Sequence, residues 1–347
     1  MKTILVQEGK VKLIVPSLKK YKLDSKMPVF YNPVMQLNRD VSVILLKALK
    51  FKGKALDVMS ASGARAIRLK KETKADVTAN DINPSARKLI KKNASLNKVT
   101  LHITDKNAEC KIGGSFDYID VDPFGTPVPY LDAAVKSLRN NGILAVTATD
   151  TSNLCGTYPD ACMRKYGSRP LRNELMNEIG IRILIKKVQE VGAQYEIALT
   201  PIFCHASNHY MRIYLRARQG AGRTDEILKQ HGKFQEKFGP IWLGKLWDEE
   251  LVEKMNKLSK DFSYQAEQLL YQITKEAQIH NIGFFDLHKI AKVKRFKELP
   301  KMNEVIYRLI DKGFKASRTH FNANAIKTNA SEKDLLKRLN LELNTSK

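Results

Sequence analysis

The stretch Ala55-Leu-Asp-Val-Met-Ser-Ala-Ser-Gly-Ala-Arg65 decides the fold of this chain. Its first four residues are typical of a buried strand, Gly63 supplies a turn, and residues 64–71 continue with helical spacing. A buried strand that passes through a tight turn into a helix is the repeating unit of an open α/β sheet. In such sheets, ligands bind beyond the carboxyl ends of the strands.

Strand and helix patterns alternate on both sides of this unit. Before it, apolar residues at helical spacing predict an amphipathic helix over residues 35–49, which carries Arg39 near its start. After it, the patterns predict strands at 76–81, 101–104, 116–121 and 142–149, and helices at 84–96, 130–138 and 170–191. Residues 195–203 and 209–217 are expected to form an antiparallel pair. The predicted fold class is therefore α/β, with a doubly wound sheet.

The chain is long enough for two domains, and Gly220-Ala-Gly-Arg-Thr-Asp marks a boundary between them. The first domain, residues 1–220, begins with a β-rich segment over residues 1–26. The second domain, residues 221–347, is expected to be a smaller α+β unit. Its predicted helices 285–293 and 301–312, followed by a strand pair, resemble a winged helix-turn-helix.

Charge indicates the class of partner. The 347 residues include 60 Lys and Arg against 36 Asp and Glu, a formal net charge of +24. Such an excess commonly pairs with polyanions, and nucleic acid is the leading partner class, although a merely solvated basic surface is an alternative.

Cysteine usage and hydropathy indicate the compartment. The four cysteines form no C-x-x-C pair, so neither a disulfide framework nor a zinc site is expected, and no metal is predicted. The segment Cys204-His-Ala-Ser-Asn-His209 is better explained as a turn between strands. No apolar run approaches the length of a membrane span, and the first residues lack a signal-type apolar stretch. We expect a cytoplasmic protein with no membrane association.

Polar residues at three predicted strand ends indicate a nucleoside-like cofactor. Asp57 ends the first strand, with only Gly63 in the turn that follows, whereas a dinucleotide site needs further glycines to admit a pyrophosphate. Asp81 ends the second strand, where an acid accepts hydrogen bonds from ribose hydroxyls. Asn107 and Ala108, after the third strand, could address an adenine edge. Together these residues predict S-adenosylmethionine, although each alone could be a helix cap or a turn residue.

The second informative stretch is Asp120-Val-Asp-Pro-Phe-Gly125, directly after a strand. Asp122 offers an acceptor for an N–H, the Pro123 carbonyl offers another, and Phe124 offers a face on which a planar base can stack. These are predicted to be the catalytic residues of chemistry on an exocyclic amine. Phe30 is expected to sandwich a flipped-out base against Phe124. Asp120 is expected to orient the loop and is the rival candidate for the base. The alternative is core packing for Phe30 and Phe124 and a structural turn for Asp122.

At this point the sequence resembles a known family, the tRNA guanine-26 N(2)-dimethyltransferases. The motifs that carry the resemblance run from about Glu8 to Thr328, and they are specific only in combination. They are Phe30-Tyr-Asn-Pro33, Asn38-Arg-Asp40, Ser60 to Arg68, Asn80-Asp81, Asp120 to Pro127, Thr147 to Thr151, Leu154-Cys-Gly156, Arg164-Lys-Tyr-Gly167 and Arg318-Thr-His320.

The resemblance implies a class I, Rossmann-like methyltransferase core and a C-terminal tRNA-associated domain. It implies that cofactor contacts come from Arg39, Arg65, Asp81, Asn107 and Ala108, and that Asp122 serves the target amine. We further expect the substrate to be contacted by Phe30, Asn32, Asp120 and Arg318, and its phosphates by the basic residues Arg164 and Lys165. The activity implied is transfer of methyl groups from S-adenosylmethionine to the 2-amino group of guanosine 26 in tRNA.

Three other functions remain open at the level of sequence. Another exocyclic amine in RNA could be the target. A non-catalytic RNA-binding protein could retain a vestigial cofactor fold. A nicotinamide oxidoreductase is disfavoured, because the turn at Gly63 has a single glycine.

Overall fold

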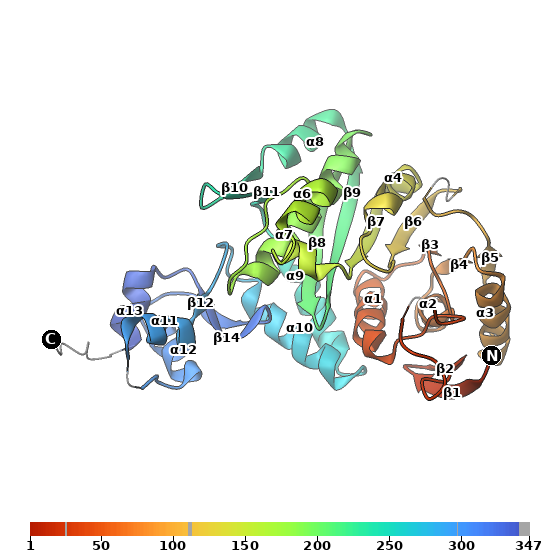
Figure 1. The fold of residues 1–347 in the computed structure, drawn as a ribbon, viewed down its shortest axis with the longest axis horizontal. Coiled ribbons are helices and arrows are strands. Elements are labelled where there is room, and N and C mark those ends of the chain that lie inside the picture. Colours follow the sequence, from red (N-terminus) through yellow and green to blue (C-terminus); the bar gives the residue numbers. More distant parts are fainter. Residues whose placement is uncertain (25, 110–112, 297, 340–347) are drawn as a thin grey trace.

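A seven-stranded mixed sheet forms the centre of the molecule (Figure 1). The structure is a computed structural model that describes residues 1–24, 26–109, 113–296 and 298–339. The strand order is β5-β4-β3-β6-β7-β9-β8. The first five of these strands are parallel, and β9 and β8 run antiparallel to their neighbours. The strands are β3 (Lys54–Asp57), β4 (Asp76–Asn80), β5 (His102–Thr104), β6 (Phe116–Val121), β7 (Leu138–Ala148), β8 (Ile197–Ser207) and β9 (Tyr210–Gln219). The predicted doubly wound sheet and its antiparallel pair are confirmed.

The helices that cover the sheet form two groups, and contacts between helices occur inside each group. The first contains α1 (Gln36–Ala48) and α2 (Ala64–Glu72), and α3 (Pro84–Leu96) lies beyond them against β5. The second contains α4 (Leu131–Lys136), α5 (Thr151–Leu154), α6 (Pro159–Tyr166) and the long α7 (Met176–Ala193). Strand residues such as Leu56, Ile119 and Leu144 are buried between the two groups, as a parallel sheet covered on both faces requires.

A hairpin formed by β1 (Thr3–Glu8) and β2 (Val11–Pro16) packs against α2 and α3. Val11, Leu13 and Val15 are buried, every second residue along β2, and the hairpin lies within the segment predicted to be β-rich. Two asparagines of α3 hold the hairpin in register: Asn93 bonds to the backbone of Ile14, and Asn97 bonds to the backbone of Lys12. The hairpin is therefore fixed to the helices that flank the first strand.

The segment after Gly220 forms α8 (Ala221–Leu228), β10 (His231–Phe234), β11 (Phe238–Trp242), α9 (Glu249–Ser259) and α10 (Tyr264–Glu276). Its large apolar residues, among them Trp242, Trp247 and Leu270, share one hydrophobic core with the seven-stranded sheet. Both tryptophans are buried. The hairpin β10–β11 was not expected, because its short strands contain glycines and no clear alternation.

The C-terminal unit has its own small core. It contains β12 (Phe285–Asp286), α11 (Leu287–Lys294), α12 (Met302–Asp311), β13 (Ala316–Thr319), β14 (Asn322–Thr328) and α13 (Glu332–Leu339), with strand order β12-β14-β13. Leu287, Val305, Leu309 and Leu335 pack together inside it. Two helices followed by a strand pair agree with the predicted winged-helix pattern.

The predicted helix at 170–191 begins six residues later than expected. The backbone of Arg169 pairs with that of Gly239, which keeps the chain extended at this point. The Asn173 side chain then accepts a hydrogen bond from the Leu175 N–H, and the regular helix starts at Met176. Tertiary pairing therefore sets the start of α7.

None of the helices among the described residues is both long and apolar enough to cross a bilayer. The same residues contain no cluster of three or more His, Cys, Asp or Glu side chains that could hold a metal ion.

Candidate active site

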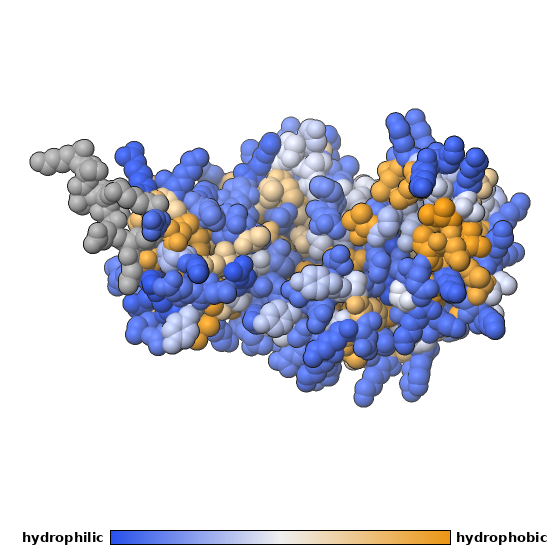
Figure 2. Space-filling view, turned by 90° about the horizontal axis from the view of Figure 1, so that it is seen from below, coloured by the Kyte–Doolittle hydropathy of each residue, from blue (hydrophilic) through white to orange (hydrophobic). Residues whose placement is uncertain are grey.

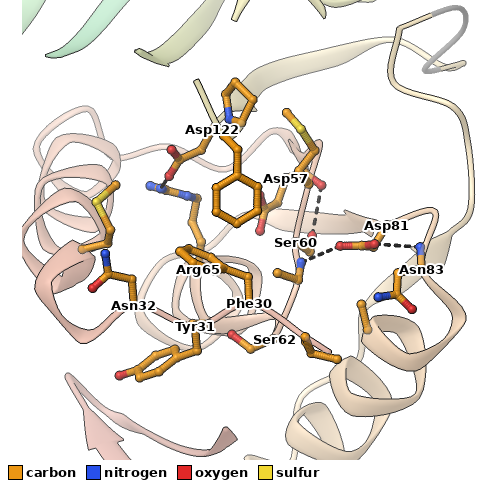
Figure 3. A pocket seen from close by; sticks show the side chains of 18 of the residues that line it. Phe30, Tyr31, Asn32, Asp57, Ser60, Ser62, Arg65, Asp81, Asn83 and Asp122 are labelled. Atoms are coloured by element: carbon orange, nitrogen blue, oxygen red, sulfur yellow. Dashed lines mark hydrogen bonds and ion pairs between the residues drawn. The ribbon is translucent and has the colours of Figure 1, made fainter. Parts of the chain in front are cut away.

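A cavity of about 410 Å³ lies at the carboxyl ends of β3, β4 and β6, the edge at which the sequence predicted a ligand site. Figure 3 shows the side chains that converge on it. Nine of the predicted site residues line it: Phe30, Asn32, Arg39, Asp57, Arg65, Asp81, Asp122, Pro123 and Phe124. Segments far apart in the sequence therefore meet at one place.

Asp122 is held by an ion pair with Arg65 (Figure 3). The Arg65 guanidinium also donates to Ser42 Oγ at 2.6 Å and lies 3.4 Å from Asp120. Its side chain is almost fully buried, whereas the side chain of Asp122 is 18% exposed. Arg65 thus fixes the direction of the Asp122 carboxylate, and one part of that carboxylate still faces the cavity.

Asp120 lies behind this pair and is completely buried. Arg212 donates to both carboxylate oxygens, at 2.9 and 2.6 Å, and the Tyr118 hydroxyl donates at 2.6 Å. Burial alone would raise the pKa of Asp120, but the guanidinium groups of Arg212 and Arg65 outweigh it and hold that pKa below its usual value. The structure does not bring Asp120 to the cavity, because its oxygens are already engaged. It supports Arg65 from behind, where the sequence predicted a substrate contact.

Asp57 has a different environment although it also ends a strand. It is 2% exposed, and its Oδ2 atom has no hydrogen-bond partner among the described residues. Burial raises the pKa of Asp57 to about 7, an effect that Arg65 opposes and Asp120 reinforces. A buried acceptor without a partner at the wall of a cavity is suited to a cationic or hydrogen-bonding ligand.

Asp81 is positioned by backbone groups (Figure 3). One of its oxygens accepts from the Ala61 N–H at 2.7 Å and the other from the Asn83 N–H at 2.8 Å. The Ala61 bond crosses from the end of β4 to the turn that contains Gly63, which has a φ of +79°. Gly63 does not line the cavity. A Cβ there would lie 3.1 Å from Ile90, so this position favours glycine for its backbone angle and for its close contact with α3.

The predicted adenine contacts lie in the loop after β5. Asn80 fastens this loop, because its side chain accepts from the Lys106 N–H and donates to the Lys106 carbonyl. Asn107 is exposed and Ala108 is buried, and neither lines the cavity. Burial, and then the charge of Glu109 in the same loop, raise the pKa of Tyr130, a residue that lines the cavity.

Arg39 reaches the cavity from α1 and is tied to the first hairpin. It donates twice to Glu8, at 2.7 Å each, and once to the Asn32 carbonyl at 3.1 Å. Glu8 also accepts from Arg68 and from the Tyr31 hydroxyl. Burial would raise the pKa of Glu8, but Arg39 and Arg68 together lower it to about 2. A single carboxylate therefore joins the hairpin, two helices and the segment that contains Phe30.

Two phenylalanines stand at the mouth of the cavity. The rings of Phe30 and Phe124 meet edge to face, with their centroids 4.4 Å apart. Phe124 is 55% exposed, which is unusual for a side chain that serves only the core. The loop behind it is fixed, because Gly125 exchanges hydrogen bonds with Thr149 and the Thr126 hydroxyl lies 3.0 Å from that of Tyr166.

Three predicted substrate contacts lie outside the cavity. Arg164 and Lys165 are on α6, and Lys165 lies 3.5 Å from Asp150, which also accepts from the Tyr166 hydroxyl. Arg318 is on β13 in the C-terminal unit, where it donates to Asn303. None of the three lines the cavity, so their placement fits contacts with a substrate larger than the cavity.

Six further lining residues have no role assigned from the sequence, although three of them, Tyr31, Ser62 and Thr149, lie inside the motifs that carry the resemblance. The other three are Met27, Met59 and Tyr130. Thr149 had a signal, since it follows strand β7 as Asp122 follows β6. No local sequence pattern indicates the side chains that support the site from behind, because their partners are far away in the sequence. These side chains are Glu8, Ser42 and Arg212.

The residues present fit S-adenosylmethionine. The cavity wall carries three carboxylates, Asp57, Asp81 and Asp122, which suit ribose hydroxyls and positive charge and would repel the phosphates of a dinucleotide. The turn at Gly63 has no further glycine with which to cradle a pyrophosphate, and the Ala61 N–H beside it is already bonded to Asp81. The donor and acceptor set thus favours a cationic nucleoside over a nicotinamide dinucleotide.

Comparison with known proteins gives the same result. The chain is 39% identical to tRNA (guanine(26)-N(2)/guanine(27)-N(2))-dimethyltransferase of Aquifex aeolicus (strain VF5), over 96% of this chain and 95% of the relative. It is 38% identical to tRNA (guanine(26)-N(2))-dimethyltransferase of Methanothermobacter thermautotrophicus, over 94% and 96%. The solved structure of Trm1 from Pyrococcus horikoshii with S-adenosyl-L-methionine superposes with a TM-score of 0.86 at 36% identity, covering 97% of this chain and 99% of that one.

The match to a family model extends over most of the chain, at residues 9–237 and 229–340. With the cavity, the carboxylates and these relatives in agreement, the chain belongs to the N2,N2-dimethylguanosine tRNA methyltransferase family.

Proposed function

We propose that this enzyme transfers methyl groups from S-adenosylmethionine to the 2-amino group of guanosine 26 in tRNA, giving mono- and dimethylguanosine. The observation that carries the proposal is the placement of Asp122. It is oriented by Arg65, partly exposed, and shares one cavity with Asp57 and Asp81. The family membership and the curated relatives support the same reaction.

When bound, S-adenosylmethionine supplies an electrophilic methyl group on a positively charged sulfur. Arg39, Asp57, Arg65 and Asp81 are the lining residues that would hold the cofactor. Asp81 keeps a free lone pair on each oxygen for ribose hydroxyls, since its backbone bonds use one per oxygen. Asn107 and Ala108 remain the proposed adenine contacts, from the loop that Asn80 fastens.

The protein must activate a weak nucleophile. The lone pair of the guanine 2-amino group is delocalised into the ring, so the nitrogen attacks poorly. Asp122 accepts one N–H and the Pro123 carbonyl accepts the other, which draws the nitrogen toward tetrahedral geometry. As the new N–C bond forms, positive charge develops on the nitrogen, and Asp122 stabilises that charge and takes the proton that the nitrogen loses. The methyl–sulfur bond breaks as the N–C bond forms, so each transfer would consume one molecule of cofactor. The monomethylated nitrogen keeps one N–H, and Asp122 accepts it in a second transfer that gives the dimethylated base.

The target base has to enter the cavity from outside its helix. Phe30 and Phe124 are the proposed stacking partners, and their edge-to-face contact must open to admit a planar ring between them. Asn32 lines the cavity beside Phe30 and is proposed to contact the base edge.

The remaining contacts are proposed to be with the tRNA backbone. Phosphates would be bound by Arg164 and Lys165 on α6, by Arg318 on β13 and by the basic face of α11, which consists of Lys292 and Lys294. Residues 221–347 form the tRNA-associated part. The face in Figure 2 is largely hydrophilic, with its hydrophobic side chains confined to separate patches. Because an RNA helix hides its base edges, the substrate would be selected by tRNA shape and local unstacking. A tRNA substrate also agrees with a cytoplasmic location.

One experiment separates this function from its alternatives. Unmodified tRNA is incubated with the enzyme and labelled S-adenosylmethionine, then digested and examined by nucleoside mass spectrometry. The expected products are N2-methylguanosine and N2,N2-dimethylguanosine, and fragment mapping assigns them to position 26. Label at guanosine 27 as well would match the name of the Aquifex relative. Label in another nucleoside would favour a different amine, and cofactor binding without turnover would favour a non-catalytic RNA-binding protein.

A further inference from the structure

A second cavity of about 440 Å³ lies beside the active site. Nine of its lining residues come from two places. Three lie in the segment after β7, namely Thr151, Ser152 and Thr157, and six lie in the β8–β9 turn and its flanks, from Ala206 to Met211. Cys155 and the start of α7 complete that part of the wall. His320 from the C-terminal unit closes it. Its volume is in the usual range for ligand sites, roughly 300–1,000 Å³.

The second cavity opens at the same edge of the sheet as the first. Met211, one of its lining residues, pairs with Ala148 at the carboxyl end of β7. Thr149 lines the first cavity and Thr151, two residues later, lines the second. A ligand that spans both would therefore cross only the short segment 149–151.

Tyr210 carries an unsatisfied hydroxyl at the wall of the second cavity. It lines the second cavity, is 3% exposed, and its hydroxyl has no hydrogen-bond partner among the residues that the structure describes. Burial, followed by the charges of Tyr214 and Asp122, raises its pKa, so the hydroxyl is within electrostatic reach of the proposed catalytic carboxylate. A buried hydroxyl that lacks a partner indicates a missing one, because such groups are normally bonded.

The linings of the two cavities differ in charge. The first cavity carries three carboxylates, whereas the residues that line the second include none. The second presents hydroxyl, amide and imidazole groups, together with the flexible apolar side chains of Met176 and Met211. The backbone of Arg172 passes close to this wall, since a Cβ on Gly156 would come within 3.0 Å of the Arg172 Cβ and Gly156 precedes the lining residue Thr157. An anionic group is tolerated here, and a planar one has surfaces on which to pack.

We propose that the second cavity receives a nucleotide adjacent to the target guanosine in the same tRNA strand. This inference rests on the proposed function. Extruding one base disturbs the stacking of the next, which then needs a place of its own. Tyr210 and His209 would bind the ribose, base edge or phosphate of that neighbour. His320 forms part of the cavity wall, because its two ring nitrogens are engaged by Glu276 and by the Ala206 N–H. Two adjacent nucleotides are thus held at once, and the neighbour helps to select the site.

Two substitutions test the contacts. Tyr210→Phe removes only a hydroxyl, and His209→Ala removes an exposed imidazole from the β8–β9 turn. Each is expected to lower kcat/KM for unmodified tRNA about fivefold, the factor that one hydrogen bond of about 1 kcal/mol represents. The KM for S-adenosylmethionine should stay unchanged. His102→Ala is the matched control, because this exposed histidine on β5 lies away from both cavities, and it should behave as wild type.

Altered substrates separate a nucleotide contact from a structural effect. Transcripts that lack the base at position 25 or at position 27 are compared with the intact transcript. One of them is expected to lower kcat/KM at least fivefold for wild type, and this penalty should shrink in His209→Ala and Tyr210→Phe, as a double-mutant cycle detects. The proposal for the second cavity would be overturned if the penalty of the substitution and the penalty of the missing base simply multiplied. It would also be overturned if the variants used every transcript as the wild type does. Absence of methylation by the wild-type enzyme would instead overturn the proposed function.

Discussion

At the scale of single residues, two aspartates that end neighbouring strands have opposite environments. Asp57 is buried, lacks a partner on one oxygen and has a pKa of about 7. Asp122 is ion-paired with Arg65 and partly exposed. The strand position alone does not assign a role to either. The difference comes from the side chains that the fold places around them, and it separates a proposed cofactor contact from the proposed base.

Replacement of Asp122 by Asn keeps the shape of the side chain and removes its ability to take a proton. We expect kcat to fall by about 10²–10⁴, the usual contribution of a positioned general base. Affinity for S-adenosylmethionine and for tRNA should change little, because Arg65 keeps its contacts with Ser42 and Asp120. Single-turnover rates and calorimetric titrations measure the two quantities. Wild-type rates in this variant would remove Asp122 from the mechanism.

The raised pKa of Asp57 predicts proton release on cofactor binding. The free enzyme holds a proton on this group below about pH 7, and a cationic ligand favours the ionised form. Affinity for S-adenosylmethionine should therefore rise as the pH increases from 5 toward 7. Calorimetry at pH 6 in buffers of different ionisation enthalpy should detect the released proton.

Two variants make that measurement specific. Asp57→Asn should abolish the dependence on buffer, whereas Asp122→Asn should retain it. A dependence of equal size in Asp57→Asn would assign the proton to another group.

At the scale of elements, Glu8 fixes the β1–β2 hairpin to α1 and α2. Its pKa is lowered from 4.5 to about 2 in the folded protein. The stabilisation is therefore complete above about pH 4.5 and is lost as the pH falls toward 2, and its size is about 3 kcal/mol. Glu8→Gln should lower the free energy of unfolding by this amount at pH 7, and the difference from wild type should narrow on acidification.

Urea unfolding at pH 7, 5, 4 and 3 tests this expectation. Asp76→Asn is a suitable control, because Asp76 pairs with Lys70 at the surface and such pairs contribute little. If the difference between wild type and Glu8→Gln were constant over this range, the lowered pKa of Glu8 would not be the source of the stability.

Elements whose ends are encoded locally were predicted from the sequence, and elements set by distant contacts were not. Helix α3 has its predicted bounds, because Asn83 caps it and Pro84 occupies its first turn. The start of α7 depends on pairing between Arg169 and Gly239, which no local pattern reveals. The residues of the site also fall into these two classes, those placed by local structure and those placed by distant contacts. Asp57, Asp81 and Asp122 meet because parallel strands end together, while Arg212 reaches Asp120 across 92 residues of sequence.

At the scale of the whole molecule, the net charge of +24 predicts tRNA binding that weakens steeply with salt. Lys292 and Lys294 lie exposed in the last turn of α11. Replacing both by Ala should reduce the slope of log K against log salt by about 1.5, since each lost phosphate contact contributes about 0.7–0.9. Filter binding or fluorescence anisotropy between 50 and 300 mM salt measures the slope.

The control for this experiment lies at the opposite edge of the sheet. Lys136 and Arg139 stand where α4 meets the start of β7, far from the carboxyl ends of the strands. Replacing this pair by Ala should leave the slope unchanged. Equal effects of the two double variants would mean that the basic face of α11 is not a preferred binding surface.

The contact between Phe30 and Phe124 has a consequence for selectivity against small molecules. In the free enzyme the two rings are in contact. A guanine must therefore break their mutual attraction, about 1 kcal/mol, before it gains stacking contacts of its own. A polynucleotide offsets that penalty with many phosphate contacts, whereas free guanosine or GMP has few or none. We therefore expect that the enzyme does not methylate mononucleotides, so that S-adenosylmethionine is not consumed on them.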